Sequence, residues 1–275
     1  RSAEGTGVSI GIALSGADCT SVDELMRRAD IAMYAAKAGG TNNVALYEPG
    51  MGQTRLDQNA VAQALRVALD RDEFVVHYQP IVDLKTRQVS SVEALVRWMD
   101  PERGLVPPAA FIEDAEETGM IVSIGRRVLE IASEQAARWR RDAADAADLH
   151  LSVNVSARQL WHEGFRGDVR DLLAETGLEP SALTLEVTES IFLDDANAAG
   201  DRLRELKGLG VRLAIDDFGT GFSSLSYIHN YPCDVLKIDR LFVTAITDEE
   251  DDSSPFISTI VSLGNALGWA ATATL

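Results

Sequence analysis

The sequence Ala214-Ile215-Asp216-Asp217-Phe218-Gly219-Thr220-Gly221-Phe222-Ser223-Ser224-Leu225 places two adjacent carboxylates at the end of an apolar segment and follows them with a loop that contains two glycines. Two acids that leave a buried strand side by side repel each other unless a cation or strong hydrogen-bond donors neutralise them. A divalent metal ion is the simplest partner for Asp216 and Asp217. Gly219 and Gly221 would let the loop approach whatever the acids hold. The alternative is a turn that begins at an aspartate and caps the next helix.

The length and composition of the chain bound its class. It has 275 residues, of which 46% are hydrophobic, and this suits one large domain or one domain plus a fragment. The formal net charge of −18 opposes binding along a polymeric nucleic acid but is compatible with a small phosphate-bearing ligand. No apolar run reaches the ~20 residues of a membrane span. We therefore expect a cytoplasmic protein, although a full-length protein could be attached to a membrane through N-terminal regions outside this sequence.

The first 50 residues predict only a small β-α-β piece. Residues 8–14 read as a strand, Ser21 and Glu24 have the spacing that begins a helix, and residues 44–47 read as a second strand. Such a piece cannot bury both faces of its own elements, so residues 1–50 should be the end of another domain. The runs VSIGIALS and DELMRRADIAMYAAKAGGTNNVALYEP resemble the C-terminal end of a GGDEF domain, the family of cyclic di-GMP synthases. That family's catalytic motif has no counterpart here, so we predict no cyclase activity.

The main domain is expected to begin at residue 61. Residues 51–60 (MGQTRLDQNA) are polar and contain a glycine, which indicates a short linker, and residues 61–275 then alternate short β-branched segments with helical ones. The expected strands are residues 75–82, 91–98, 149–155, 183–187, 212–215 and 235–238. The expected helices are residues 110–116, 121–140, 159–176, 196–209 and 256–267.

This alternation is typical of parallel strands joined by crossover helices. Its length favours a TIM-like (β/α) barrel over an open doubly wound sheet, because no GxGxxG or phosphate-binding loop follows any strand. Residues 75–84 and 88–98 are separated only by Lys85-Thr86-Arg87, which is too short for a crossover helix, so these first two strands should pair antiparallel. The predicted fold class is therefore an α/β, TIM-like barrel with an antiparallel first strand, preceded by the small β-α-β remnant.

Polar residues interrupt the apolar strands near their carboxyl ends, which meet on one face of a parallel barrel. These residues are Glu93, Arg97, Asn154, Glu186, Glu189, Asp216, Asp217, Lys237 and Asp239. Each would cost roughly 1 to 3 kcal/mol if buried without a partner, so convergence on one ligand explains them together. Carboxylates and an amide oxygen, without His or Cys, are the hard donors that Mg²⁺ or Mn²⁺ prefers.

Five motifs in this order resemble the EAL-domain family of cyclic di-GMP phosphodiesterases: EALVRW, NVS, EVTES, DDFGTGFSSL and LKIDR, within about residues 61–270. The resemblance implies hydrolysis of one phosphodiester bond of cyclic di-GMP to linear pGpG, in bacterial second-messenger signalling, at a site with two Mg²⁺ or Mn²⁺ ions. It also implies which residues bind the metals. These are Glu93, Asn154, Glu186 and Asp216 for the first metal, with Asp217 helping to hold the second.

The resemblance also implies roles around the metals. Lys237 would orient the attacking water or offset developing charge, and Asp239 would hold Lys237. Arg97 would bind a substrate phosphate. Glu189 would hold the loop at residues 216–225 through backbone donors, which makes that loop a candidate switch in a homodimer.

Each of these roles has a structural alternative. Arg97 could form a surface ion pair, and Lys237 and Asp239 could pair across the barrel mouth. Glu189 is equally well explained as a structural residue. The dipeptide Gln79-Pro80, at the end of the first strand, either contacts guanine through Gln79 or simply ends an edge strand.

The chain departs from the family's pattern after residues 260–268 (IVSLGNALG). The family continues there into a strand that ends AEGVE and a last strand with a QGY-like motif, whereas this sequence reads WAATATL. We therefore expect a barrel truncated before its final strand, with impaired turnover. The rival interpretation is a non-catalytic module that binds cyclic di-GMP or another protein.

Overall fold

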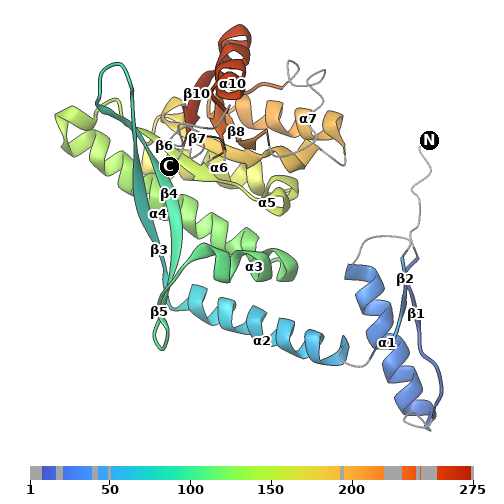
Figure 1. Cartoon of the computed structure of the whole chain (residues 1–275). Helices are drawn as coiled ribbons and strands as arrows, with labels where there is room; N and C mark the ends of the chain where they lie inside the picture. The colour runs from blue at the N-terminus through green and yellow to red at the C-terminus, as the bar shows by residue number, and fades with distance from the viewer. Residues whose placement is uncertain are drawn as a thin grey trace. The chain divides into compact units, whose positions relative to one another are not determined.

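A computed structural model gives the structure of the chain and describes residues 8–16, 21–38, 43–48, 51–192, 195–219, 231–239, 242 and 253–273. The chain divides into two compact units, residues 1–66 and residues 67–275 (Figure 1). Residues 220–225 of the glycine-containing loop lie outside the described residues.

The smaller unit pairs two short parallel strands, β1 (Ile10–Ile12) and β2 (Val44–Leu46), and α1 (Val22–Ala38) packs on them. Ser21 precedes the helix, and its Oγ accepts a hydrogen bond from the N–H of Glu24 at 3.1 Å, which caps the first turn. Several large apolar side chains of the strands are exposed. They are Ile10, Ile12, Val44 and Leu46.

The larger unit is built on a curled sheet with the strand order β10-β9-β8-β7-β6-β4-β3, and β5 pairs with β4. The strands are β3 (Phe74–Val82), β4 (Val89–Asp100), β5 (Gly104–Val106), β6 (His150–Asn154), β7 (Leu183–Thr188), β8 (Arg212–Phe218), β9 (Val235–Ile238) and β10 (Ala270–Ala273). Along the main order, neighbours from β4 to β10 are parallel, and β3 runs antiparallel to β4. The architecture is therefore mixed α/β.

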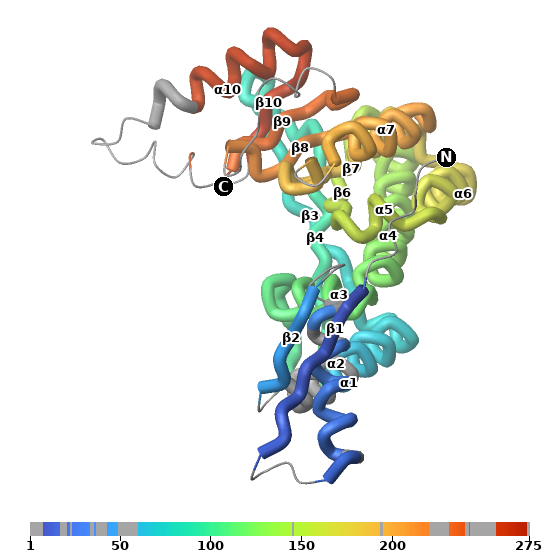
Figure 2. The backbone as a smooth tube through the Cα atoms, turned by 90° about the vertical axis from the view of Figure 1, so that its right-hand side faces the viewer, coloured from blue at the N-terminus to red at the C-terminus, as the bar shows by residue number. Residues whose placement is uncertain are grey.

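Helices cover one side of this sheet, where α4, α6 and α7 gather (Figure 2). The helices that follow α1 are α2 (Met51–Asp70), α3 (Ile112–Thr118), α4 (Ile121–Asp142), α5 (Ala157–Trp161), α6 (Phe165–Thr176), α7 (Ala196–Lys207) and α10 (Ser253–Leu267). Short 3₁₀ segments lie at Pro108–Ala110, Ala144–Ala146, Pro180–Ala182 and Glu189–Phe192. The polar stretch 51–60 lies within α2, and the assignment of domain boundaries stays a prediction.

Several elements differ from the sequence prediction, which also lacked the short strand β5. One helix over residues 159–176 is wrong, because His162 has an extended backbone (φ −68°, ψ 128°) that ends α5, and α6 begins only at Phe165. The strand β10 was not predicted, since alanine is a poor strand former. Its parallel pairing with β9 overrides that weak preference.

The strand β7 shows how the core forms. Its sequence LTLEVT is buried from Leu183 to Val187, as is typical of a parallel strand with both faces covered. Leu183 and Leu185 are fully buried, and Glu186, on the other face of the strand, is only 2% exposed. A carboxylate at such a depth requires partners from neighbouring strands.

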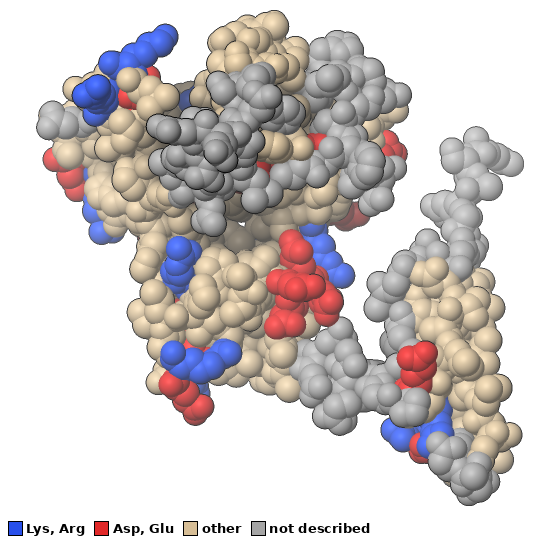
Figure 3. Space-filling view, viewed as in Figure 1, with Lys and Arg blue, Asp and Glu red and all other residues tan. Residues whose placement is uncertain are grey.

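On the face of the larger unit that Figure 3 shows, charged side chains of both signs are present, and one acidic group stands out over α3. The helix has the sequence IEDAEET and thus holds four acids. Among the helices that the structure describes, none combines the length and the hydropathy needed to cross a bilayer.

Candidate active site

The parallel register places the polar strand residues in one row. Asn154, the last residue of β6, lies opposite Glu186 of β7, and Asp216 of β8 lies opposite Thr188, two residues further along β7. Residues paired across parallel strands point to the same face, as do residues i and i+2 of one strand. Glu93 of β4, on the far side of β6, extends the row.

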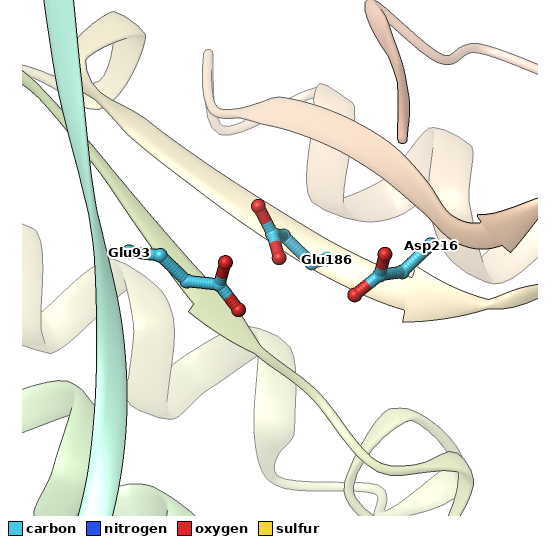
Figure 4. Close-up of side chains that lie close together, drawn as sticks. All are labelled: Glu93, Glu186 and Asp216. Atoms are coloured by element: carbon cyan, nitrogen blue, oxygen red, sulfur yellow. The ribbon is translucent and has the colours of Figure 1, made fainter. Parts of the chain in front are cut away.

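Three carboxylates from three strands converge in this row. Each of Glu93, Glu186 and Asp216 offers one oxygen, and these oxygens all lie within 4.8 Å of one another. The side chains point toward a common centre (Figure 4). Glu93 and Glu186 are buried, and the Asp216 side chain is 18% exposed, so Asp216 is the acid of this cluster that is most open to solvent. The three acids converge as predicted, but Glu93 lies in the interior of β4 and not at its carboxyl end.

The ammonium group of Lys237, on β9, lies between the three acids. Its Nζ is 3.2 Å from Oε2 of Glu93 and 2.9 Å from Oδ2 of Asp216, and it also contacts Oε2 of Glu186. Lys237 is only 3% exposed. One positive charge therefore stands against three negative charges in a nearly dry environment.

Asn154 is exposed to solvent and joins the three acids through its side-chain amide. Its Nδ2 donates a hydrogen bond of 2.9 Å to Oε1 of Glu93, which leaves the amide oxygen available to a cation or to water.

The crowding of charge shifts two pKa values. Burial raises the pKa of Glu186 to about 7, a shift that Lys237 opposes and Glu93 reinforces. For Lys237, burial disfavours the charged form, but Glu186, Asp216 and Glu93 together outweigh it and raise the pKa of the ammonium above its ordinary value. Lys237 is therefore a cation at neutral pH, and a further cation beside Glu186 would favour its ionised form.

Asp217 is directed by a local irregularity of β8. Ile215 pairs with Leu236 and Phe218 pairs with Ile238, so β8 holds one residue more than β9 over this stretch, and Asp217 has a positive φ of 55°. A bulge of this kind re-aims a side chain, and Asp tolerates the left-handed conformation better than most residues. Although Asp217 is exposed, partial burial of its carboxyl, then Asp216 and then Asp239, raise its pKa.

The donor set fits a hard divalent cation. It offers carboxylate and amide oxygens and lacks the sulfur or imidazole ligands that zinc prefers. Within the described part of the chain, the buried Oε2 of Glu93 accepts no hydrogen bond, and its charge is met by the ion pair with Lys237. The excess of negative charge over this single ammonium group favours a cation with more than one positive charge.

The comparison with known families agrees with this site. The sequence pattern of the EAL domain matches residues 62–275. The chain belongs to the EAL domain family. The match includes each of the five strands that carry the acidic cluster, its lysine and its amide.

Curated relatives of this EAL domain share about two fifths of its sequence. It is 44% identical over 259 residues to a bifunctional diguanylate cyclase/cyclic di-GMP phosphodiesterase, MucR of Pseudomonas aeruginosa, covering 94% of this chain and 37% of MucR. It is 39% identical to the cyclic di-GMP phosphodiesterase PdeR of Escherichia coli, covering 95% of this chain and 39% of PdeR. The chain thus spans less than half the length of these relatives.

A solved structure has the same fold. The phosphodiesterase MucR of Pseudomonas aeruginosa, in complex with cyclic di-GMP, superimposes with a TM-score of 0.73 at 42% identity, over 78% of this chain and 85% of that chain. A TM-score of this size indicates that the curled sheet and its helices are arranged alike in the two proteins.

Glu189 of the EAL domain lies at the start of the 3₁₀ segment after β7 and is 6% exposed. Its Oε2 accepts a hydrogen bond of 3.1 Å from the N–H of Gly219, just after β8. Its Oε1 is buried without a hydrogen-bond partner among the described residues. Glu189 therefore links the end of β7 to the first residue after the paired aspartates.

Arg97 and Gln79 line the same face as Glu93 but are not part of the cluster. Arg97 is four residues beyond Glu93 on β4, and its Nη1 donates to the carbonyl oxygen of Val96 at 2.8 Å. Gln79 of β3 lies directly opposite Glu93 in the antiparallel ladder. Paired residues of antiparallel strands share a face, so both side chains flank the acids.

A capping box that begins two residues after Asn154 was not predicted from the sequence. Ser156 and Gln159 form a capping box at the start of α5, in which Ser156 Oγ accepts from the N–H of Gln159 at 3.2 Å and Gln159 Oε1 accepts from the N–H of Ser156 at 3.3 Å. Gln159 is 2% exposed and packs on Gly125 of α4. The spacing S-x-x-Q after the strand is typical of a capping box and could have been found in the sequence. The contact of Gln159 with Gly125 could not, because α4 is distant in the sequence.

Proposed function

We propose that this EAL domain is a metal-dependent phosphodiesterase that hydrolyses one phosphodiester bond of cyclic di-GMP and releases linear pGpG. The observation that carries the proposal is the convergence of Glu93, Glu186, Asp216 and Lys237 within one buried group. The printed names of the relatives MucR and PdeR support the choice of substrate.

Glu93, Asn154, Glu186 and Asp216 would hold the first Mg²⁺ or Mn²⁺, and Asp217 would help to hold a second. Bound divalent metals make water more acidic and stabilise the charge that develops on phosphate oxygens. The raised pKa of Asp217 and its closeness to Asp216 and Asp239 support a second cation beside the first, since a cation there would relieve the repulsion.

The remaining residues would serve substrate and water. Lys237 would orient the attacking water or offset the developing charge, with Asp239 close to the same site. Arg97 would bind a phosphate of the substrate, and Gln79 would contact a guanine. Glu189 would keep the loop that begins at Gly219 in place, and we propose this loop as a switch in a homodimer.

The finer architecture is also part of the proposal. The curled sheet would be the greater part of a TIM-like barrel in which β3 is the antiparallel first strand. Residues 1–50 would be the end of a GGDEF-like domain. Two observations support this: the alignment with the bifunctional relative MucR is longer than the EAL domain match, and the strands β1 and β2 expose apolar side chains that a larger domain would cover.

The test is incubation of the protein with cyclic di-GMP and Mn²⁺, with separation of pGpG by chromatography. Wild type should form pGpG, and Glu93→Gln should reduce the rate at least about 100-fold, because loss of a direct ligand costs more than the roughly 10 to 100-fold seen for residues behind the ligands. Glu113→Gln on α3, an exposed acid outside the cluster, is the matched control and should keep the wild-type rate. Binding of cyclic di-GMP by folded, Mn²⁺-loaded protein without pGpG would replace the proposal with a non-catalytic binding role.

A further inference from the structure

Lys237 occupies the place in the cluster that a cation would take. Its Nζ contacts one oxygen of each of the three acids, and these contacts span strands β4, β7 and β8. The contacts with Glu186 and Asp216 are hydrogen bonds, and the contact with Glu93 is an ion pair. One lysine therefore serves three carboxylates, where an ordinary ion pair involves one.

The oxygens that Lys237 contacts are the ones turned toward the centre. The other oxygen of Glu93 accepts from Nδ2 of Asn154, and the other oxygen of Asp216 accepts from the N–H of Asp217 at 2.9 Å. A divalent cation bound by these acids would have to use the same inward oxygens. Mg²⁺ requires its ligands at about 2.0 to 2.1 Å in a near-octahedral arrangement, which leaves no room for an ammonium group among the same three oxygens.

Lys237 also has a structural task when no metal is bound. Three carboxylates within 4.8 Å in a nearly dry site repel one another strongly. A cation among them allows β4, β7, β8 and β9 to approach, because it turns this repulsion into attraction across the sheet.

We infer that Lys237 is an internal cation that holds the acidic cluster together in the metal-free protein and leaves its oxygens when a divalent metal binds. The inference rests on the proposed metal site. It has a consequence for the order of events, since Lys237 becomes available to water or to a substrate phosphate only after the metal has displaced it. Metal binding and the release of the lysine are then one coupled step, and the lysine competes with the metal.

The experiment compares wild type with Lys237→Met and Lys237→Gln, and it reads metal binding rather than turnover. Mn²⁺ binding is measured by calorimetry at mildly alkaline pH, and thermal unfolding is measured in chelator and in saturating Mn²⁺. In chelator, both variants should unfold at a lower temperature than wild type. Saturating Mn²⁺ should raise their unfolding temperature by more than it raises that of wild type. Their Kd for Mn²⁺ should fall by about tenfold or more, because the competing charge a few ångströms from the metal is gone.

The matched control is Lys207→Met. Lys207 of α7 contacts the carboxylate of Asp234, which directly precedes β9, so this substitution removes a lysine ion pair outside the cluster. This variant should change thermal stability by the same amount in chelator and in Mn²⁺ and keep the wild-type Kd.

Three results would overturn the inference. The first is an unchanged Kd for Mn²⁺ in both Lys237 variants, and the second is a higher Kd in both. The third is that both variants stay unfolded even in saturating Mn²⁺, since the metal should replace the missing cation. Wild-type protein that binds no Mn²⁺ would instead overturn the metal site of the proposed function, and the inference with it. Variants that are unfolded in chelator and fold on addition of Mn²⁺ would support the inference directly.

Discussion

Gly125 in the middle of α4 offers a sharp test of the packing behind the site. A Cβ built at this position would lie 2.0 Å from Nε2, 2.3 Å from Cδ and 2.4 Å from Oε1 of Gln159. Gln159 is buried, and its side chain is held in the capping box with Ser156, two residues after Asn154. Gly125→Ala therefore forces the amide of Gln159 out of its place.

The expected cost can be worked out from three contributions. Alanine in place of a helix-interior glycine normally stabilises a protein by about 0.5 to 1 kcal/mol. Here the hydrogen bond from the N–H of Ser156 to Oε1 of Gln159 is lost, which costs about 1 kcal/mol, and overpacking of the α4 and α5 contact adds about 1 to 3 kcal/mol. Gly125→Ala should therefore lower the free energy of unfolding by about 1 to 3 kcal/mol, the reverse of the sign that helix propensity alone predicts.

The assay is urea unfolding of a double-mutant cycle. In a Gln159→Ala background the space opposite Gly125 is open, so Gly125→Ala should stabilise by up to about 1 kcal/mol. Gly167→Ala, on α6, is the matched control, because a Cβ there meets nothing within 4 Å, and it should be neutral or mildly stabilising. The reasoning is refuted if Gly125→Ala stabilises wild type as much as it stabilises the Gln159→Ala protein.

Three further outcomes are expected. Arg97→Ala should raise the Kd for cyclic di-GMP about tenfold or more and leave the Kd for Mn²⁺ unchanged, because a hydrogen bond to a charged group contributes roughly 1.5 to 3 kcal/mol; unchanged affinity for cyclic di-GMP would favour a structural Arg97. Burial, and then Arg212, lower the pKa of His150 in the folded protein. Because the imidazole of the unfolded chain is protonated more readily, the free energy of unfolding falls as pH drops below about 6.5. His150→Gln should flatten that decline in urea unfolding measured against pH, and an equally steep decline would contradict it. Glu189→Ala should speed hydrogen exchange at the Gly219 amide and lower turnover several-fold without changing Mn²⁺ affinity, and an unchanged exchange rate would argue against a hold on this loop.

The acids of the site could be predicted from sequence because burial makes them conspicuous. In LTLEVT the only charged residue is Glu186, and a carboxylate in a strand with both faces covered needs a reason other than solvation. The same argument identifies Glu93 and Asp216. The carboxyl ends of parallel strands meet on one face, which places Glu186 and Asp216 together without knowledge of the register, whereas Glu93 lies in the interior of β4.

Other features could not be predicted because they depend on contacts between distant segments. The composition of residues 51–60 indicates a linker, yet these residues continue into α2, since a polar sequence is compatible with a helix as well as a loop. The contact of Gln159 with Gly125 depends on how α5 meets α4, which no local pattern contains. The contacts of Lys237 with the three acids are of the same kind, because its ladder partner on β10 is Thr272, not an acid.

The contact between Lys237 and Glu93 connects the shape of the sheet to the chemistry of the site. These residues lie on β9 and β4, which are separated by β8, β7 and β6 in the strand order. Neighbouring strands lie about 4.8 Å apart, so in a flat sheet the two backbones would be about 19 Å apart, beyond the combined reach of a lysine and a glutamate. The observed Nζ to Oε2 distance is 3.2 Å. The sheet must therefore curl until its concave face brings side chains of five strands to one point, and the attraction between this lysine and this acid in turn favours the curl that the site requires.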